Sequence, residues 1–478
     1  MRRLLPLLLA AGLVLAGAAS ADVIRAPRHG GVLVGTPRAD RFLGGPGADA
    51  VQAAFGGVDR IACGAGRDVV SADLADRVAA SCEVVGRRLS LDPSTNAASQ
   101  HETAVEPDSF SWGSTVVAAF QLGRFERGAA SAIGTAVSSD AGRTWRRSSL
   151  PALTVESSPA GSWSAASDPA VAFDAAHGVW LAGALAVAQG TTGVVVARSP
   201  DGLRWSAPVV VATGPILDKD WFACDDGGAT WSAPVRAAAT LVGTQPVIQP
   251  DGTLVVVAGD YNGQAGLTGS IASLVSADGG ETFARSLVAP LRAHASGPLR
   301  AIPLPSVDVD PAGTIVAAWH DCSLSVGCGG NDLVLSTSTD GSTWSAPARV
   351  PLSAGGVRVE AFLPGLVADP TRPGHLGLDY AFWLPGSCPA ACRLGIGFVS
   401  STDGGATWSV PQQLSTEPIR MSWLPRSEGG RMIGDYLSTS YAAGRFVPVY
   451  TLATAPQRGR LHEAVFAASL AAGPRPRR

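Results

Sequence analysis

A short motif, Ser-x-Asp-x-Gly-x-Thr-Trp, recurs along this chain and restricts the folds that it can adopt. Six copies, some of them imperfect, lie at residues 138–145, 199–205, 224–231, 276–283, 338–344 and 401–408. The Asp side chain is suited to accept hydrogen bonds from backbone N–H groups of its own turn, and Gly supplies the positive φ that a tight turn needs. The Trp that follows starts a return strand and brings a large apolar surface to bury. The motif therefore predicts a repeat built from β-hairpins.

The segments between these turns are typical of short β-strands. Runs such as 179–188 and 376–383 are mainly apolar and are bounded by Gly, Pro or Asp. The 478 residues include 57 Gly and 34 Pro, and only 16% are charged, which favours a turn-rich all-β protein over a helical one. No long stretch shows helical periodicity.

Seven segments predict where successive repeat units begin. They lie at residues 106–108, 168–171, 218–221, 245–247, 304–307, 363–366 and 434–436. A four-stranded propeller blade needs about 40–50 residues. We therefore expect an all-β fold in which residues 101–470 form a β-propeller of seven blades, with six as the alternative. The segment near residues 100–105 is expected to complete the last blade by pairing with the C-terminal strands.

The third unit is shorter than its neighbours. Asp201 and Asp226 are 25 residues apart, whereas the other consecutive turn aspartates are 52–63 residues apart. This spacing leaves no room for two middle strands, so we expect the third blade to be incomplete. Cys224 lies at the same junction and is left without a local partner. An internal deletion, or a segment lost from the gene model, explains both features.

Residues 22–90 carry a second repeat, rich in Gly and Asp. Residues 44–52 read Gly-Gly-Pro-Gly-Ala-Asp-Ala-Val-Gln, and aspartates recur in near register at Asp40, Asp49, Asp59 and Asp68. This pattern resembles the calcium-binding nonapeptides of RTX (haemolysin-type) proteins. The resemblance implies a small parallel β-roll in which the four aspartates bind Ca²⁺ between successive turns. A metal-free solenoid held by a Cys63–Cys82 disulfide is the alternative.

The ends of the chain and its cysteines point to export. Residues 1–21 combine an Arg-Arg start, an apolar run and a final Ala-Ser-Ala, the pattern of a secretory signal peptide. Seven cysteines fit an oxidising compartment, and three local disulfides are predicted: Cys63–Cys82, Cys322–Cys328 and Cys388–Cys392. Residues 91–100 read as a linker and residues 471–478 as a disordered tail.

Charge and hydropathy exclude some partners. The net charge of −3 gives no electrostatic attraction to nucleic acid. No run after residue 21 approaches the roughly 18 apolar residues of a membrane-spanning helix. We therefore expect a secreted monomer without a membrane span.

The Asp turns resemble the Asp boxes (BNR repeats) of the sialidase superfamily, and residues 100–470 are similar in order to secreted bacterial sialidase-like proteins. The resemblance implies a glycoside hydrolase that acts on terminal sialic acid or related glycans and needs no cofactor for catalysis. Sialidases share an Arg-Ile-Pro motif, three arginines that bind the substrate carboxylate, a Tyr nucleophile paired with Glu, and an Asp acid/base. The first unit of this chain lacks Arg-Ile-Pro, and the nearest string, at residues 300–303, has an inserted residue.

Residues near the unit starts are expected to converge on the central funnel, because inner strands line it. The catalytic candidates are Tyr436, Glu360, Asp168, Arg300 and Arg431, and the substrate-binding candidates are Arg358, Arg420 and Tyr380. Further carboxylates stand near unit starts at Glu106, Asp108, Asp218 and Asp435. Each candidate has a structural alternative: Arg431 and Asp435 as an ion pair, Tyr436 as a packed aromatic, and the carboxylates as caps of turns.

Two functions stay open at this point. One is a secreted glycoside hydrolase of the sialidase type. The other is a non-catalytic secreted propeller that binds a glycan or a protein at the cell surface. Convergence of three arginines on one point of the funnel would favour sialidase chemistry, and its absence would exclude it.

Overall fold

A computed structural model describes residues 22–215, 217–219, 221, 230–231, 241–262, 267–354, 356–388 and 391–473. Within these ranges the regular structure is β-strand, apart from two single 3-10 turns at Val326–Cys328 and Met421–Trp423. The all-β fold class is therefore confirmed. In this part of the chain, no helix is long and apolar enough to cross a membrane. The predicted signal peptide and residues 474–478 lie outside the described residues.

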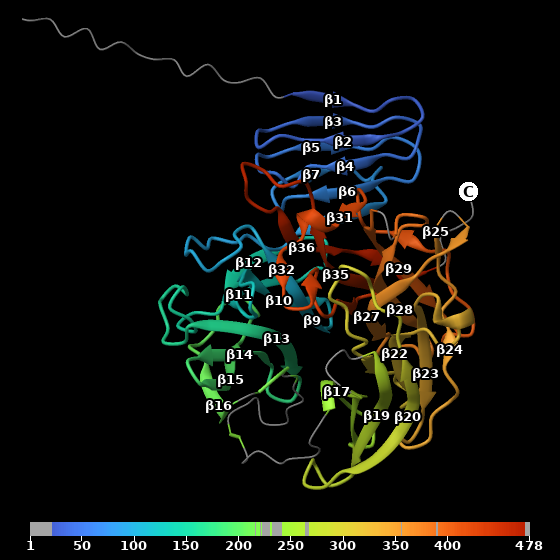
Figure 1. The fold of residues 1–478 in the computed structure, drawn as a ribbon. Coiled ribbons are helices and arrows are strands. Elements are labelled where there is room, and N and C mark those ends of the chain that lie inside the picture. Colours follow the sequence, from blue (N-terminus) through green and yellow to red (C-terminus); the bar gives the residue numbers. More distant parts are fainter. Residues whose placement is uncertain are drawn as a thin grey trace, which may run out of the picture.

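The N-terminal residues form a parallel β-solenoid at one end of the molecule (Figure 1). One sheet contains β1 (Val23–Arg25), β3 (Arg41–Leu43), β5 (Arg60–Ala62) and β7 (Arg77–Val78), and the other contains β2 (Val32–Val34), β4 (Ala50–Gln52), β6 (Val69–Ala72) and β8 (Val84–Arg88). Apolar side chains such as Leu33, Phe42 and Val51 fill the space between the sheets, together with the predicted Cys63–Cys82 disulfide. The predicted parallel roll is thus present.

Among the described residues, six groups of four antiparallel strands follow. In chain order they are β9 (Ala104–Trp112), β10 (Thr115–Arg124), β11 (Ala130–Ser138) and β12 (Arg146–Ser149); β13 (Ala165–Asp174), β14 (Val179–Ala188), β15 (Thr191–Ser199) and β16 (Val209–Gly214); β17 (Leu241–Ile248), β18 (Leu254–Tyr261), β19 (Thr268–Ser276) and β20 (Ala284–Arg292); β21 (Ser306–Val309), β22 (Ile315–Asp321), β23 (Asp332–Ser338) and β24 (Ala348–Arg349); β27 (Ala361–Ala368), β28 (Leu376–Trp383), β29 (Arg393–Ser401) and β30 (Gln412–Gln413); and β34 (Ser438–Ala442), β35 (Arg445–Ala453) and β36 (Glu463–Ala468) with β8. The first strand of every group lines one central cavity, which gives a propeller-like arrangement.

The remaining strands are short, and some form two-stranded sheets of their own. They are β25 (Ser353–Ala354), β26 (Val357–Arg358), β31 (Ile419–Arg420), β32 (Arg426–Ser427), β33 (Gly430–Arg431) and β37 (Leu470–Ala471). The predicted disulfides Cys322–Cys328 and Cys388–Cys392 close loops after β22 and β28, so all three predicted pairs are confirmed.

Six of the seven predicted unit starts lie in, or next to, the first strands of these groups. The seventh, at residues 218–221, lies between β16 and β17. Most of the predicted third blade, with Cys224 and its Asp turn, falls on residues 222–229 and 232–240, outside the described part. The predicted number of blades therefore stays a prediction.

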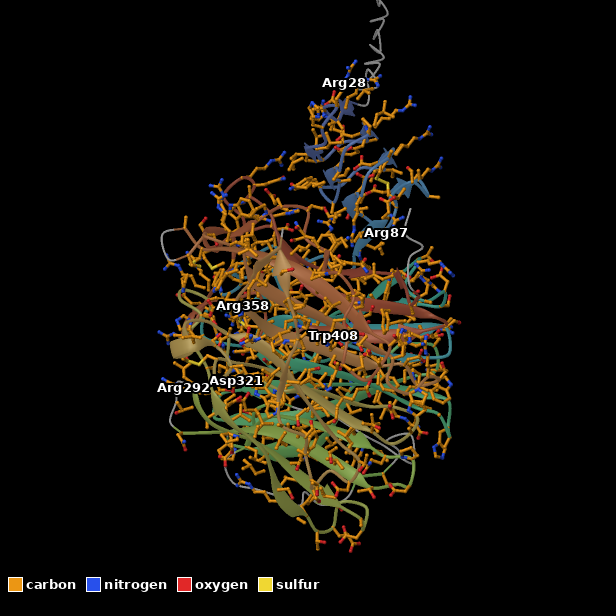
Figure 2. The ribbon with its side chains drawn as sticks, turned by 90° about the vertical axis from the view of Figure 1, so that its right-hand side faces the viewer. Arg28, Arg87, Arg292, Asp321, Arg358 and Trp408 are labelled. Atoms are coloured by element: carbon orange, nitrogen blue, oxygen red, sulfur yellow. A yellow bond between two sulfur atoms is a disulfide. The ribbon has the colours of Figure 1, made fainter. Side chains whose placement is uncertain are left out.

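Strand β8 joins the solenoid to the propeller. It pairs in parallel with β6 and antiparallel with β36, where Arg88 lies opposite Phe466 and Gly86 opposite Ala468. It covers the edge of the last group at residues 466–468, where residues 100–105 were expected to pair. That segment reaches β36 at Glu102, whose carbonyl oxygen accepts the Glu463 N–H at 3.0 Å, and residues 104–112 form β9. Figure 2 shows Arg87 at this junction, where its guanidinium donates to the carbonyl oxygens of Asp73 and Asp76, both at 3.0 Å.

The predicted linker is docked on the propeller. The side-chain amide of Gln100 donates to the carbonyl oxygen of Arg426 at 2.8 Å and accepts the Arg426 N–H at 2.7 Å. The segment between β8 and β9 is thereby held against the β32–β33 hairpin, and the solenoid and the propeller share one continuous hydrogen-bonded sheet.

The Asp turns hold neighbouring groups together. Five of the six turns lie among the described residues, and in each the Asp accepts backbone N–H groups of its own turn. In the last turn Asp403 accepts the Thr407 N–H at 2.8 Å. The indole N–H of Trp205 donates to Thr135 at 3.1 Å and that of Trp344 donates to Ser273 at 3.2 Å, in each case a residue of the preceding group. The turns therefore join adjacent groups.

Candidate functional site

Four inner strands share a two-residue bulge whose first residue has a positive φ. In β9 this residue is Glu106 (φ 54°), and in β13 it is Asp168 (φ 47°). Leu363 of β27 (φ 54°) and Gly243 of β17 (φ 63°) occupy the same position. A positive φ strains residues other than Gly, and a bulge changes the direction of a side chain. The bulge belongs to the fold, but only the first two groups place a carboxylate there.

The inner strands surround a cavity of about 390 Å³. Its lining includes Asp108 of β9, Val171 of β13 and Asp435 just before β34. A cavity of this size accommodates a small ligand. Glu106 lies two residues before Asp108 and Asp168 lies three residues before Val171, the first lining residues of their strands. Because the charge of Asp168 also acts on Glu106, both residues lie near the same end of the cavity, which we call its mouth.

Glu106 is the most deeply buried carboxyl at this mouth, with an exposure of 2%. The side-chain amide of Gln121 donates to its carboxylate, and Arg124 donates to the Gln121 carbonyl oxygen at 3.2 Å. Burial first, and then the nearby carboxylates of Asp168 and Asp435, raise the pKa of Glu106 to about 8. Glu106 therefore holds a proton at neutral pH.

Asp435 reaches the same mouth from the loop before β34. Its carboxylate accepts both Nε and Nη2 of Arg300, the first at 2.9 Å. A Cβ added to Gly434 would lie 3.2 Å from the backbone nitrogen of Glu106, so the loop packs closely against β9. The side chain of Asp218 is the most exposed of these carboxylates. Partial desolvation first, and then the charges of Asp168 and Asp435, raise the pKa of Asp218.

An aromatic pair lies beside these carboxylates. The ring centres of Trp221 and Tyr436 are 5.6 Å apart, and both residues line the cavity. The ammonium nitrogen of Lys219 lies 3.8 Å from the centre of the Trp221 ring and 4.0 Å from that of Tyr436. Asp108 accepts the Val171 N–H at 2.7 Å; burial raises its pKa, which Lys219 and the Trp221 indole oppose. The predicted nucleophile Tyr436 thus packs against a cation, with 5% of its surface exposed.

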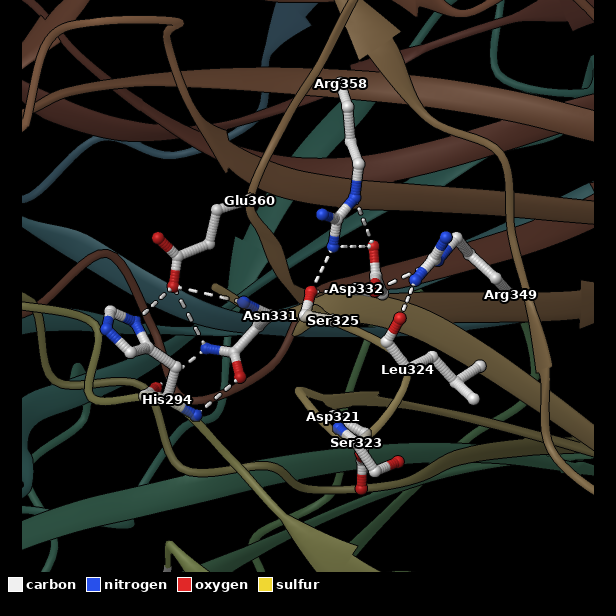
Figure 3. A network of polar contacts seen from close by, with 10 residues as sticks. All are labelled: His294, Asp321, Ser323, Leu324, Ser325, Asn331, Asp332, Arg349, Arg358 and Glu360. Atoms are coloured by element: carbon white, nitrogen blue, oxygen red, sulfur yellow. Dashed lines mark hydrogen bonds and ion pairs between the residues drawn. The ribbon is translucent and has the colours of Figure 1, made fainter. Parts of the chain in front are cut away.

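Two other predicted site residues lie in a separate network (Figure 3). Glu360 faces His294, with 2.9 Å between Oε1 and Nδ1, and accepts Asn331 Nδ2 at 3.3 Å. Arg358 donates through Nε to Asp332 at 2.9 Å. Neither Glu360 nor Arg358 lines the cavity.

The remaining predicted residues also point elsewhere. Arg431 donates to the carbonyl oxygen of Leu424 at 2.8 Å, and the guanidinium of Arg420 lies 5.6 Å from the Trp423 ring. Tyr380 is 1% exposed in the core of the group that starts with β27. Of the four predicted arginines, Arg300 alone stands at the mouth, where Asp435 already neutralises it. The arginine convergence that sialidase chemistry requires is not formed by these residues.

The predicted calcium ligands are engaged by the backbone of the solenoid. Asp59 accepts the Asp40 N–H and Asp68 accepts the Asp49 N–H, both at 2.7 Å. Asp49 itself accepts N–H groups from Gly31 and Gly45, both at 2.9 Å. No group of three or more His, Cys, Asp or Glu side chains among the described residues is arranged to hold a metal ion. Oδ1 of Asp40 and Oδ2 of Asp59 and Asp68 are buried without a hydrogen-bond partner among the described residues, and calcium binding by these residues stays a prediction.

Sequence reasoning missed three contributors to the mouth: Gln121, Lys219 and Trp221. Gln121 lies inside β10, where nothing local marks it as polar support for Glu106. The carboxylate–proline pairs at 106–107 and 168–169 were visible, and they carried the signal for the two bulged carboxylates.

No protein-family model matches this chain, and no curated protein matches it. Several solved structures are similar to it at low identity. A protein of unknown function from Dyadobacter fermentans is 17% identical with a TM-score of 0.44, over 80% of this chain and 99% of that one. A Trypanosoma rangeli sialidase in complex with sialic acid is 14% identical with a TM-score of 0.43, over 80% of this chain and 57% of that one. A GH93 α-L-arabinofuranosidase of Fusarium graminearum is 12% identical with a TM-score of 0.37, over 64% of this chain and 93% of that one. Because every one of these scores is below 0.5, we argue the function from the site residues.

Proposed function

We propose that the protein is a secreted glycoside hydrolase whose active site is the acidic mouth of the central cavity. The observation that supports it is the pair of bulged carboxylates, Glu106 and Asp168, which share one mouth but differ in environment. Burial raises the pKa of Glu106 to about 8, whereas Asp168 is only half-buried. Two carboxyl groups whose environments separate their protonation states are the usual basis of glycosidase acid and base roles.

The proposed chemistry follows from these two groups. Glu106 donates its proton to the glycosidic oxygen as the bond to the sugar breaks, and the leaving group departs as an alcohol. The carboxylate of Asp168 stabilises the positive charge that develops on the sugar ring, and either attacks it or activates a water molecule. Arg300 pairs with Asp435 next to Glu106, and the charge of Asp435 helps Glu106 to keep its proton until substrate arrives.

The charge of the mouth favours a neutral or cationic glycan over a sialoside. Sialic acid carries a carboxylate, and a site for it needs unpaired guanidinium groups. Here Arg300 is paired with Asp435, and Arg358, Arg420 and Arg431 contact other residues. Repulsion from Asp168 and Asp218 opposes an anionic sugar as well. We therefore place the substrate outside the sialic acids.

Export is part of the same proposal. The three disulfides suit an oxidising compartment, in agreement with the signal-like pattern of residues 1–21. A glycan or glycoprotein outside the cell is the expected partner.

The test is hydrolysis of a panel of aryl glycosides that includes neutral sugars, amino sugars and sialic acid. Asp168→Asn is the informative variant, because Asn tolerates a positive φ and keeps the shape of the side chain. We expect turnover of at least one neutral or amino glycoside, and a loss of at least about 100-fold in Asp168→Asn. Asp251→Asn, at an exposed turn of the third group, is the matched control and should retain full activity.

Two results would oppose this function. Turnover of the sialoside alone would show that the charge argument is wrong. Binding of a glycan without turnover of any substrate would favour the non-catalytic propeller that the sequence leaves open.

A further inference from the structure

Lys219 is the sole lysine of the chain, whose other 35 basic residues are arginines. Its ammonium nitrogen faces two aromatic rings at 3.8 and 4.0 Å, and donates to the carbonyl oxygen of Pro169 at 3.4 Å. A cation over the face of Trp or Tyr is attracted by the ring quadrupole, and the attraction grows when water is excluded. Trp221 and Tyr436 therefore form an aromatic cage that already holds an ammonium group.

The charged residues around the cage favour a positively charged group inside it. Asp108 lies in contact with the Trp221 indole, and the charge of Lys219 acts on both Asp108 and Asp218. Asp168 directly precedes Pro169, whose carbonyl oxygen accepts the ammonium group. Arg300 is neutralised by its ion pair. Removal of Lys219 from the cage would leave a net negative site lined by aromatic rings.

The backbone of Lys219 is strained. Its φ is 57°, a left-handed conformation that is unfavourable for a residue other than Gly. The contacts in the cage offset this strain, so a ligand that replaces the ammonium group also allows the backbone to relax.

From these observations we propose that the cage of Trp221 and Tyr436 binds the protonated amine of an amino-sugar residue, and that Lys219 fills the cage until such a glycan displaces it. The proposal rests on the proposed function, because the carboxylate pair next to the cage identifies the ligand as a glycan. It names the substrate class, a glycan with a free, non-acetylated amino group.

The sole lysine makes displacement directly observable. Protein labelled with ¹³C at the lysine ε-carbon gives one lysine signal, and the two rings above should shift this signal upfield. The probes are a fully deacetylated glucosamine trimer, its N-acetylated counterpart and Nα-acetyl-lysine amide. We expect the deacetylated trimer to move the signal to the position of an exposed lysine, and the N-acetylated trimer to leave it unchanged.

Each alternative outcome has a defined meaning. No movement with the deacetylated trimer, or equal movement with both trimers, would overturn the inference. Equal movement with Nα-acetyl-lysine amide would support an amine cage but overturn the assignment to amino sugars.

Variants give a second, independent readout. Lys219→Ala should bind the deacetylated trimer more tightly than the wild type, because a tethered competitor at millimolar effective concentration has been removed. Tyr436→Phe keeps the ring and should keep the affinity, whereas Tyr436→Leu should lose at least about fivefold. If Lys219→Ala binds no better, Lys219 is not a competitor for the cage.

The inference and the proposed function can fail separately. Asp168→Asn should still show displacement of Lys219 by the deacetylated trimer although it does not hydrolyse glycosides. If the protein binds the trimer and cleaves nothing, the proposed hydrolase function is wrong and the cage inference stands. If it cleaves neutral glycosides while amines leave its lysine signal unchanged, the cage inference alone is wrong.

Discussion

At the scale of single residues, the protonation of Glu106 sets the pH range in which the proposed acid can act. Its pKa of about 8 comes first from burial, then from Asp168 and Asp435, against the opposing charges of Arg124 and Arg300. A general acid works only while it is protonated, so kcat/KM should fall as the pH rises through about 8. A pH profile on the best aryl glycoside of the panel measures this fall in kcat/KM, the alkaline limb of the profile.

The variant Asp435→Asn tests the cause of that limb. It removes one negative charge near Glu106 and releases the guanidinium of Arg300, and both changes lower the Glu106 pKa. The alkaline limb should therefore move to lower pH by about one unit. Asp251→Asn, which changes the same charge on the exposed surface, should leave the limb in place. A limb that does not move in Asp435→Asn would show that another group controls it.

At the scale of the structural element, the Asp turn is a local unit. Asp278 accepts the Thr282 hydroxyl at 2.5 Å, the Thr282 N–H at 3.0 Å and the Ser276 hydroxyl at 2.7 Å. These contacts, the Thr282 hydroxyl first, lower the pKa of Asp278. Asp278→Ala should therefore lower the melting temperature by about 2–5 °C. Glu281→Ala removes the same charge from an exposed position of the same turn and should change little. Thermal unfolding of the two variants checks this, and equal effects would mean that charge rather than the turn hydrogen bonds is responsible.

The stabilisation by Asp278 depends on pH. Because the folded-state pKa of Asp278 lies below its ordinary value, its stabilising effect is present above about pH 4 and is lost as the pH falls below that value. The difference between wild type and Asp278→Ala should therefore shrink in acid.

The same element shows what sequence can predict. All the partners of the Asp in a turn lie within five residues of it, so the residue pattern predicts them directly. The bulges are different, because the two-for-one pairing of Glu106-Pro107 opposite β10 depends on a partner strand. The pairing of β8 with β36 joins residues more than 370 positions apart, and no local pattern predicts it.

The predicted site residues show the same difference between local patterns and long-range contacts. Asp168 was predicted from its place at a unit start, and the structure brings it to the mouth with Arg300 and Tyr436. Glu360 has an equally favourable place in the sequence, but His294 and Asn331 draw its side chain into another network. Position along an inner strand predicts which end of the cavity a residue approaches, whereas the direction of its side chain depends on neighbours from other groups.

At the scale of the whole molecule, the solenoid and the propeller should unfold as one unit. Strand β8 belongs to both, and the carbonyl oxygen of Val465 accepts the N–H of Leu89 at 2.7 Å just beyond it. Separation of the two parts would expose the edge of β36, with its unpaired backbone groups. Calorimetry of the intact protein should therefore show a single transition.

Gly86→Val tests the coupling through β8. A Cβ at Gly86 would lie 2.6 Å from the hydroxyl oxygen of Tyr450, which lies in β35 and is fully buried. The clash should force β8 away from the last group and split the transition in two, with the solenoid unfolding first because it then lacks its support. Ala65→Val introduces the same side chain at an exposed turn of the solenoid and should keep the single transition. A single transition in Gly86→Val would mean that contacts other than β8, such as the docked segment at Gln100, couple the two parts, and the matched variant Gln100→Ala would then be the one to split it.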